Sequence, residues 1–120
     1  MKQLLLATAM LISTTAFGQQ RWGSVFEGSP VELFDDADYR LFEQALHTAL
    51  DQTAQHEPLA WSNAKSGHHG DVSVIRTFES RSRECKELGL RNAAQGRKDD
   101  QRLTFCRIDN QWKLLGDSQL

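Results

Sequence analysis

The feature that most constrains this chain is a series of short segments between Trp61 and Leu115, separated by turn residues and containing the only two cysteines. Apolar and polar residues alternate within the segments, which is typical of β-strands with one buried face. Gly, Asp and Asn between the segments favour tight turns. Strands joined by short turns pair with their sequence neighbours, so the series predicts an antiparallel meander.

Five strands are expected in this series. They cover residues 59–62, 71–78, 84–92, 102–108 and 111–115. A charged turn over 96–100 and a two-residue turn at Asp109-Asn110 separate the last three strands. On the second strand, one face is expected to carry Val72, Val74, Arg76 and Phe78.

One amphipathic helix is expected before the strands, from about Asp36 to Gln55. Asp35 has the chemistry of an N-cap whose carboxylate accepts the backbone N–H of Asp38. The apolar positions then recur along one helical face at Tyr39, Phe42, Leu46, Ala49, Leu50 and Thr53. The acidic residues at the helix start superficially resemble a calcium loop, but they lack its later glycine and distal glutamate, so we interpret them as capping residues.

The first eighteen residues have the pattern of a secretory signal peptide. A basic residue precedes a short apolar run that ends in Ala16-Phe17-Gly18. The alternative is an N-terminal core helix, but three consecutive hydroxyl residues interrupt its apolar face at 13–15. We therefore expect a chain exported to the periplasm or envelope, with an irregular lead-in over 19–33. In that lead-in, Trp22 and Phe26 either pack onto the domain or form an exposed patch.

Composition narrows the possible partners. The formal net charge is −2, and loss of Lys2 with the signal peptide changes it to −3, which gives no reason to expect a nucleic-acid partner. The mean hydropathy is −0.53 and no later apolar run is long enough for a transmembrane span. About one hundred residues remain for a single domain with a modest core.

The cysteines are expected to form a disulfide, since an exported chain meets an oxidising compartment. Two free thiols or half of a metal site are the alternatives. If the third and fourth strands form a hairpin centred between Gln95 and Gly96, Cys85 lies ten residues before the centre and Cys106 ten residues after it. The two side chains then lie opposite each other on neighbouring strands, which favours a structural disulfide.

The motifs Trp61-Ser62-Asn63, Ser66-Gly67, Arg76-Thr77-Phe78 and Cys106-Arg107 follow one another in this order along the chain. In this order they resemble the C-terminal domain of the seventeen-kilodalton bacterial surface antigen family. The family pattern begins with W-x-N-x-x-S-G-x-x-G-x-V and continues with R-T-aromatic, C-R and A-C-R-x-x-D-G-x-W. This chain matches it over residues 34–115 at Trp61, Asn63, Ser66, Gly67, Gly70, Val72, Arg76-Thr77-Phe78, Cys85, Cys106-Arg107, Asp109 and Trp112. It departs from the pattern at Lys86 and Asn110, and it lacks the lipobox cysteine and glycine zipper of many members, so membrane attachment is not carried over.

The resemblance implies an exported envelope protein of a Gram-negative bacterium, with no enzymatic activity and no cofactor. We expect a non-catalytic binding or scaffolding module whose partner is an unidentified envelope component. No G-x-S-x-G elbow accompanies the histidines, and the paired carboxylates, at Glu84 with Glu87 and at Asp99-Asp100, fall on solvated strand faces and a turn.

Two further sites are considered. Adjacent histidines on a turn suggest a metal-binding alternative that would use His68, His69 and Asp71, against the simpler interpretation of solvated turn residues. A basic and aromatic sheet face is a candidate for docking lipopolysaccharide, peptidoglycan or an acidic protein, against the simpler interpretation of cationic side chains that cover an exposed face. The residues of that face are Arg76, Phe78, Phe105, Arg107, Trp112 and Lys113.

The fold class expected is therefore α+β, with one helix packed on a four- to five-stranded antiparallel sheet and one disulfide. The domain covers residues 34–116, and residues 117–120 form a tail. Either sheet face is a candidate for contact with the helix. The expected core comprises Tyr39, Phe42, Leu46, Leu50, Trp61, Val72, Val74, Phe78, Leu88, Leu103, Phe105 and Trp112.

Overall fold

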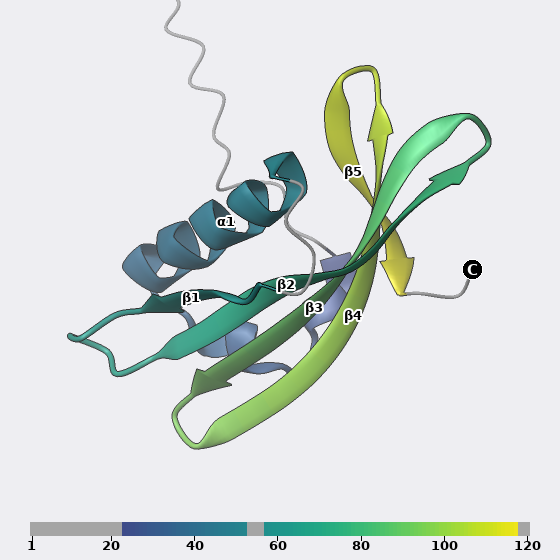
Figure 1. The fold of residues 1–120 in the computed structure, drawn as a ribbon. Helices are drawn as coiled ribbons and strands as arrows, with labels where there is room; N and C mark the ends of the chain where they lie inside the picture. The colour runs from purple at the N-terminus through teal and green to yellow at the C-terminus, as the bar shows by residue number, and fades with distance from the viewer. Residues whose placement is uncertain (1–22, 53–56, 118–120) are drawn as a thin grey trace, which may run out of the picture.

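A computed structural model describes residues 23–52 and 57–117 (Figure 1). Its elements are η2 (Gly23–Phe26), η3 (Pro30–Leu33), α1 (Asp36–Asp51), β1 (Leu59–Ser62), β2 (His69–Ser80), β3 (Arg83–Ala94), β4 (Arg97–Ile108) and β5 (Gln111–Asp117). The strands form one antiparallel sheet in the order β1-β2-β3-β4-β5, which confirms the expected meander and α+β class. The expected signal peptide and Trp22 lie outside the described residues.

Helix α1 begins as its sequence predicts. The Asp35 carboxylate accepts the backbone N–H of Asp38 at 2.7 Å, and the Asp38 carboxylate accepts the N–H of Asp35 at 3.0 Å. This reciprocal capping box satisfies two N–H groups that have no partner within the helix. The helix ends at Asp51, with Gln52 already in an extended conformation, so the expected end at Gln55 is wrong. Residues 53–56 lie outside the described residues.

The hairpin of β3 and β4 has the register expected from the cysteines. Its pairs run from Ala94 opposite Arg97 to Cys85 opposite Cys106, and the two cysteines form the disulfide, with Cα atoms 4.1 Å apart. The strands are longer than predicted, because the charged residues 97–100 continue β4 instead of forming a turn. Those side chains can extend from a strand since one sheet face is open to solvent along this region.

The turn at Asp109-Asn110 also confirms its prediction. Both residues have positive φ angles, 52° and 62°. This is the conformation of a two-residue type I′ turn, which matches the twist of the strands it joins.

An irregularity in β2 changes which side chains share a face. Val74 lies opposite Leu88, but the next pair is Arg76 with Glu87, so Ile75 is an extra residue in the ladder. Such a bulge shifts the following side chains to the other face. The expectation that Val72 and Val74 share a face with Arg76 and Phe78 is therefore wrong.

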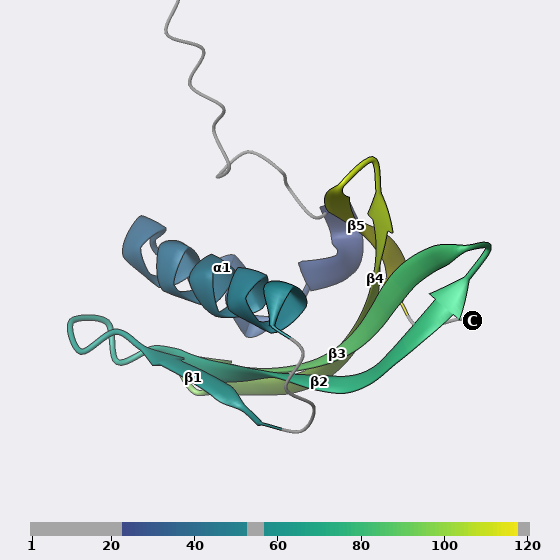
Figure 2. The ribbon, with the colours of Figure 1, turned by 45° about the horizontal axis from the view of Figure 1, so that its top comes forward.

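The core lies between the sheet and the helical elements. α1 lies over β1 and β2, while η3 contacts β3 and β4 on the same face (Figure 2). We call this the inner face. Its buried apolar residues are Phe26, Val31, Phe42, Ala45, Leu46, Ala49, Leu50, Trp61, Val72, Val74, Leu88, Leu90, Leu103 and Phe105.

Three expected core residues behave differently. Tyr39 and Trp112 are only partly buried against the core, and Phe78 lies on the opposite face because of the bulge.

Phe26, which is 6% exposed, packs its ring against Phe42 with centroids 5.8 Å apart. The packing interpretation of Phe26 is thus confirmed.

Candidate functional site

The most elaborate polar cluster of the domain is centred on Asp38. This carboxylate is fully buried, although it lies in the first turn of α1. Besides the backbone of Asp35, it is bonded by three side chains of the segment that connects β1 to β2. The contacts to the Asp38 oxygens are 2.8 Å from Asn63 Nδ2, 2.7 Å from Ser66 Oγ and 2.7 Å from His68 Nδ1. The cluster therefore ties the start of the helix to the sheet.

The electrostatics of Asp38 follow from these contacts. Burial alone would raise the pKa of Asp38, because it disfavours the charged form. Hydrogen bonds from Ser66, the Asp35 N–H, His68 and Asn63 favour the charged form more strongly and lower the pKa to about 2. The carboxylate is consequently charged over the physiological pH range, and the stability of the folded state depends on the groups that donate hydrogen bonds to it.

Aromatic rings cover this cluster. Phe34 stacks on the His68 ring with centroids 6.3 Å apart and meets Trp61 edge-on at 5.0 Å. Trp61 in turn lies opposite Gly70 on β2, where a Cβ atom would clash with the Arg91 carbonyl oxygen and come within 2.7 Å of the Trp61 indole nitrogen. The motif from Trp61 to Gly70 therefore combines a ring, a glycine that makes room for it, and the polar side chains that hold Asp38.

The structure separates the residues of the metal-binding hypothesis. His68 is 7% exposed and faces Asp38, so its expected place on a solvated turn is wrong, whereas His69 is exposed. The carboxylate of Asp71 pairs with Arg91 at 3.1 Å. Across residues 23–52 and 57–117, no three His, Cys, Asp or Glu residues are grouped so as to hold a metal ion.

The cluster also differs from a nucleophilic catalytic triad. In a triad the serine hydroxyl bonds the histidine and the histidine bonds the carboxylate. Here the Ser66 hydroxyl donates directly to Asp38, as an anchor of the loop.

The other end of α1 is held by Lys86, which the sequence marked only as a departure from the family pattern and for which no structural role was expected. The side chain lies on the inner face, is 1% exposed, and its Nζ donates to the carbonyl oxygens of Leu50 at 2.7 Å and Gln52 at 2.8 Å. These carbonyls have no partner within the helix, and a cation there also complements the helix dipole. Burial lowers the pKa of Lys86. The sequence alternation of β3 could have indicated that Lys86 is buried, because Lys86 shares its face with Leu88 and Leu90.

The opposite face of the sheet, which we call the outer face, is not covered by any of the described helical elements (Figure 2). It carries Phe78, Cys85, Cys106 and Lys113, which are cross-strand neighbours on β2, β3, β4 and β5. Arg102 is exposed on the same face, opposite Gly89. The guanidinium of Arg76 lies over the Phe78 ring at 4.3 Å and pairs with Glu87 at 3.5 Å.

The six residues proposed as one basic and aromatic face are divided between the two faces. Arg76, Phe78 and Lys113 lie on the outer face, whereas Phe105, Arg107 and Trp112 lie on the inner side. Phe105 is fully buried, and the Trp112 indole N–H donates to Asp51 of α1 at 3.3 Å. A docking role for the outer three stays a prediction.

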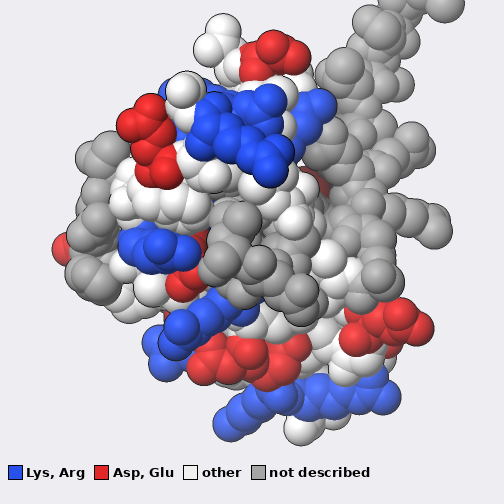
Figure 3. All heavy atoms as spheres, turned by 90° about the vertical axis from the view of Figure 1, so that its right-hand side faces the viewer, with Lys and Arg blue, Asp and Glu red and all other residues white. Residues whose placement is uncertain are grey.

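Charge is distributed unequally along the chain. Residues 23–57 contain eight acidic residues and one basic residue, while residues 58–117 contain eight acidic and eleven basic residues. The helical layer is thus acidic and the sheet is basic. Figure 3 views the side that lies at the right in Figure 1 and shows Lys and Arg groups interspersed with Asp and Glu groups.

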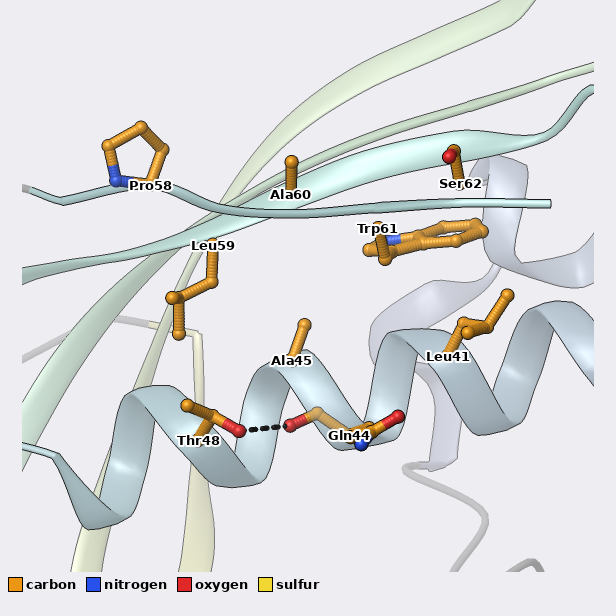
Figure 4. Close-up of a pocket in the computed structure, with 9 residues that line it drawn as sticks. All are labelled: Leu41, Gln44, Ala45, Thr48, Pro58, Leu59, Ala60, Trp61 and Ser62. Carbon is orange, nitrogen blue, oxygen red and sulfur yellow. Dashed lines mark hydrogen bonds between the residues drawn. The ribbon is translucent and has the colours of Figure 1, made fainter.

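A groove of about 440 Å³ lies between α1 and β1 (Figure 4). The side chains that line it are Leu41, Gln44, Ala45, Thr48, Pro58, Leu59, Ala60, Trp61 and Ser62. None of them is ionisable, so the groove does not hold a general acid or base of its own. Thr48 uses its hydroxyl to bond the Gln44 carbonyl oxygen at 2.9 Å.

The described part of the chain contains no helix of the length and hydropathy required to cross a membrane. Comparison with known proteins gives one match. The model of the 17 kDa outer membrane surface antigen family matches residues 48–113, which is more than half of the chain. No curated protein and no solved structure matches significantly. The matched region runs from the last turn of α1 to β5, and includes the loop that binds Asp38, the disulfide and Lys86, so the chain belongs to the 17 kDa outer membrane surface antigen family.

Proposed function

We propose that this protein is a non-catalytic binding module of the cell envelope that binds an anionic envelope polymer through the outer face of its sheet. Membership of an outer membrane surface antigen family suggests the envelope as its location. The observation that carries the proposal is the arrangement of the layers. α1 and the 3-10 helices all lie against the inner face, whereas the outer face is left open among the described elements.

The chemistry of the outer face supports an anionic ligand. On this face Asp71 and Glu87 are paired with Arg91 and Arg76, and the exposed Asp100 lies opposite Arg91 on β4. Arg102 and Lys113 are exposed there, and neither has an ion pair among the described residues. Net positive charge beside the partly buried ring of Phe78 suits a polymer that combines phosphate or carboxylate groups with less polar parts.

Binding of the purified chain to lipopolysaccharide and to peptidoglycan tests this proposal. Affinity is measured at about 50 mM and about 300 mM salt, because screening weakens contacts between exposed charges. The double variant Arg102→Gln with Lys113→Gln should bind about tenfold more weakly than the parent at low salt. Arg40→Gln, which removes an exposed charge from α1, is the matched control and should bind like the parent.

Two results would reject the proposal. One is the absence of binding to both polymers at low salt. The other is an affinity that the double variant and the salt concentration leave unchanged, since the outer face would then not be the site.

A further inference from the structure

Strand β1 forms an unprotected edge of the sheet. It is the first strand in the order, and no described strand lies beside its free side. Its sequence, Leu59-Ala60-Trp61-Ser62, contains no charge, proline or bulge, which are the usual features that prevent an edge strand from pairing with another chain. The opposite edge strand, β5, carries Lys113.

The hydrogen-bonding direction of β1 follows from its hairpin. The Asn63 N–H donates to the His68 carbonyl oxygen at 2.9 Å, and this pair continues the register of β1 with β2. Bonded and non-bonded pairs alternate along an antiparallel ladder. Trp61 and Leu59 therefore bond to β2, while the N–H and C=O groups of Ala60 and Ser62 point toward the open edge.

The helix beside this edge is uncharged on the side of the groove. Leu41, Gln44 and Thr48 line the groove from α1 (Figure 4). One turn before and after them, Ala37 and Gln52 are uncharged as well. Apart from the buried Asp38 and the partly buried Tyr39, the charged and titratable positions of the helix lie on an adjacent stripe, about 100° away, at Asp36, Arg40, Glu43, His47 and Asp51.

We propose that a second copy of this chain docks here, with the two β1 strands paired antiparallel about a two-fold axis at Trp61. Ala60 of each copy then faces Ser62 of the other, so every outward N–H and C=O group of the two residues gains a partner. The two sheets become one continuous sheet. An isologous contact of this kind closes at the dimer.

Charge at the ends of the paired strands fits the same register. Glu57 lies four residues before Trp61 and Lys65 four residues after it, and both are exposed. Antiparallel pairing about Trp61 brings Glu57 of each copy to the end at which Lys65 of the other copy lies. The surface is thus uncharged at its centre and complementary at its two ends.

The spacing of the helices fits as well. α1 contacts both β1 and β2, so it lies near the line between them. Its distance from the α1 helix of the second copy is then about two strand spacings, roughly 10 Å, which is a normal distance for packed helices. The uncharged flanks at Leu41, Gln44 and Thr48 would fill the grooves.

Sedimentation equilibrium of the purified chain, with and without substitutions, tests the dimer. The parent should be a dimer, and Glu57→Lys should raise its dissociation constant at least about tenfold at low salt, because like charges then meet at both ends. Adding Lys65→Glu to that variant should restore dimerisation to within about threefold of the parent. Glu79→Lys, an equal charge change at the far end of β2, is the matched control and should behave like the parent.

A backbone substitution provides an independent check. Ala60→Pro removes an outward N–H without removing a bond to β2, so the monomer should keep its far-ultraviolet circular dichroism while the dimer is lost. If that variant fails to fold, the Glu57→Lys variant and its combination with Lys65→Glu still test whether the dimer forms through β1. A monomeric parent at millimolar concentration, a dimer insensitive to Glu57→Lys, or open assemblies larger than a dimer, as expected if β1 pairs with β5 of the next copy, would each overturn the proposal.

Discussion

At the scale of single residues, Asp38 is a charged carboxylate that is fully buried. A buried carboxylate is costly unless its oxygens are bonded, and here four donors from two segments supply those bonds. Ser66 and Asn63 are therefore required as partners of Asp38, besides their role in the loop. Asp38, which belongs to the capping box at the start of α1, is therefore also the residue to which the β1–β2 loop is bonded.

The pH dependence of stability should report this anchor. The pKa of Asp38 is about 2 in the folded state against an ordinary value of 3.8, so the folded state favours the charged form. The resulting stabilisation is present in full above about pH 5 and is lost progressively as the pH falls toward 2. The difference corresponds to about 2.5 kcal/mol of unfolding free energy.

Urea denaturation at pH 6 and pH 2.5 measures this contribution. In Asp38→Asn the decrease in stability between the two pH values should be smaller by about 2 kcal/mol, and the variant should be less stable at pH 6. Asp36→Asn changes an exposed aspartate in the same turn and serves as the control. An unchanged pH profile in Asp38→Asn would show that the cluster does not hold a charged carboxylate.

At the scale of elements, α1 is fixed at both ends by contacts from the sheet. The Asp38 cluster holds its first turn, and Lys86 of β3 bonds the carbonyl groups of its last turn. These contacts explain why the helix ends near Asp51, although the apolar period continues to Thr53. Lys86 donates hydrogen bonds to carbonyl groups that have no partner within the helix, and this stabilises the end of the helix at that position.

Replacing Lys86 should therefore destabilise the end of α1 and the whole domain. Lys86→Met keeps the length and apolar stem but leaves buried carbonyl groups without a donor, so we expect a loss of about 2–3 kcal/mol. Lys86→Arg, which retains the charge and the donors, should lose less. Chemical denaturation gives the free energies, and hydrogen exchange of the amides at 48–52 localises the effect. A methionine variant as stable as the parent would show that the bonds of Lys86 to the carbonyl groups give no net stabilisation over an apolar side chain at this position.

At the scale of the whole molecule, the helical layer covers one end of a long bent sheet (Figures 1 and 2). The disulfide joins β3 and β4 toward the other end of the sheet. Cys85 and Cys106 join β3 and β4 beyond the bulge, near β5. The bond therefore holds the part of the sheet that α1 does not cover. A small domain with a modest core gains proportionally more from such a cross-link.

Removal of the disulfide should lower global stability. The bond closes a loop with a sequence separation of 21, for which the chain-entropy model gives roughly 3 kcal/mol. The double variant Cys85→Ala with Cys106→Ala should show this loss in thermal or chemical unfolding. The same variant without a measurable loss of stability would mean that the hairpin register alone holds this end of the sheet.

Local features of the sequence were sufficient to predict the start of the helix, the turn at Asp109-Asn110 and the β3–β4 register. The physical reason is that each depends on residues close in sequence or on a symmetric hairpin. The N-cap needs only Asp35 and Asp38, and the turn needs only residues that tolerate positive φ. The cysteines lie at equal distances from Gln95-Gly96, so the hairpin brings them together.

Only the tertiary structure decided which face of the sheet is buried and what the polar residues do. The bulge at Ile75 moves Phe78 to the outer face, and no local signal in β2 marks it. His68 was expected in solvent, yet it is buried because α1 brings Asp38 to the loop. Such contacts join residues thirty or more positions apart in the chain. Their energy depends on burial and on partner geometry, which sequence alone does not specify.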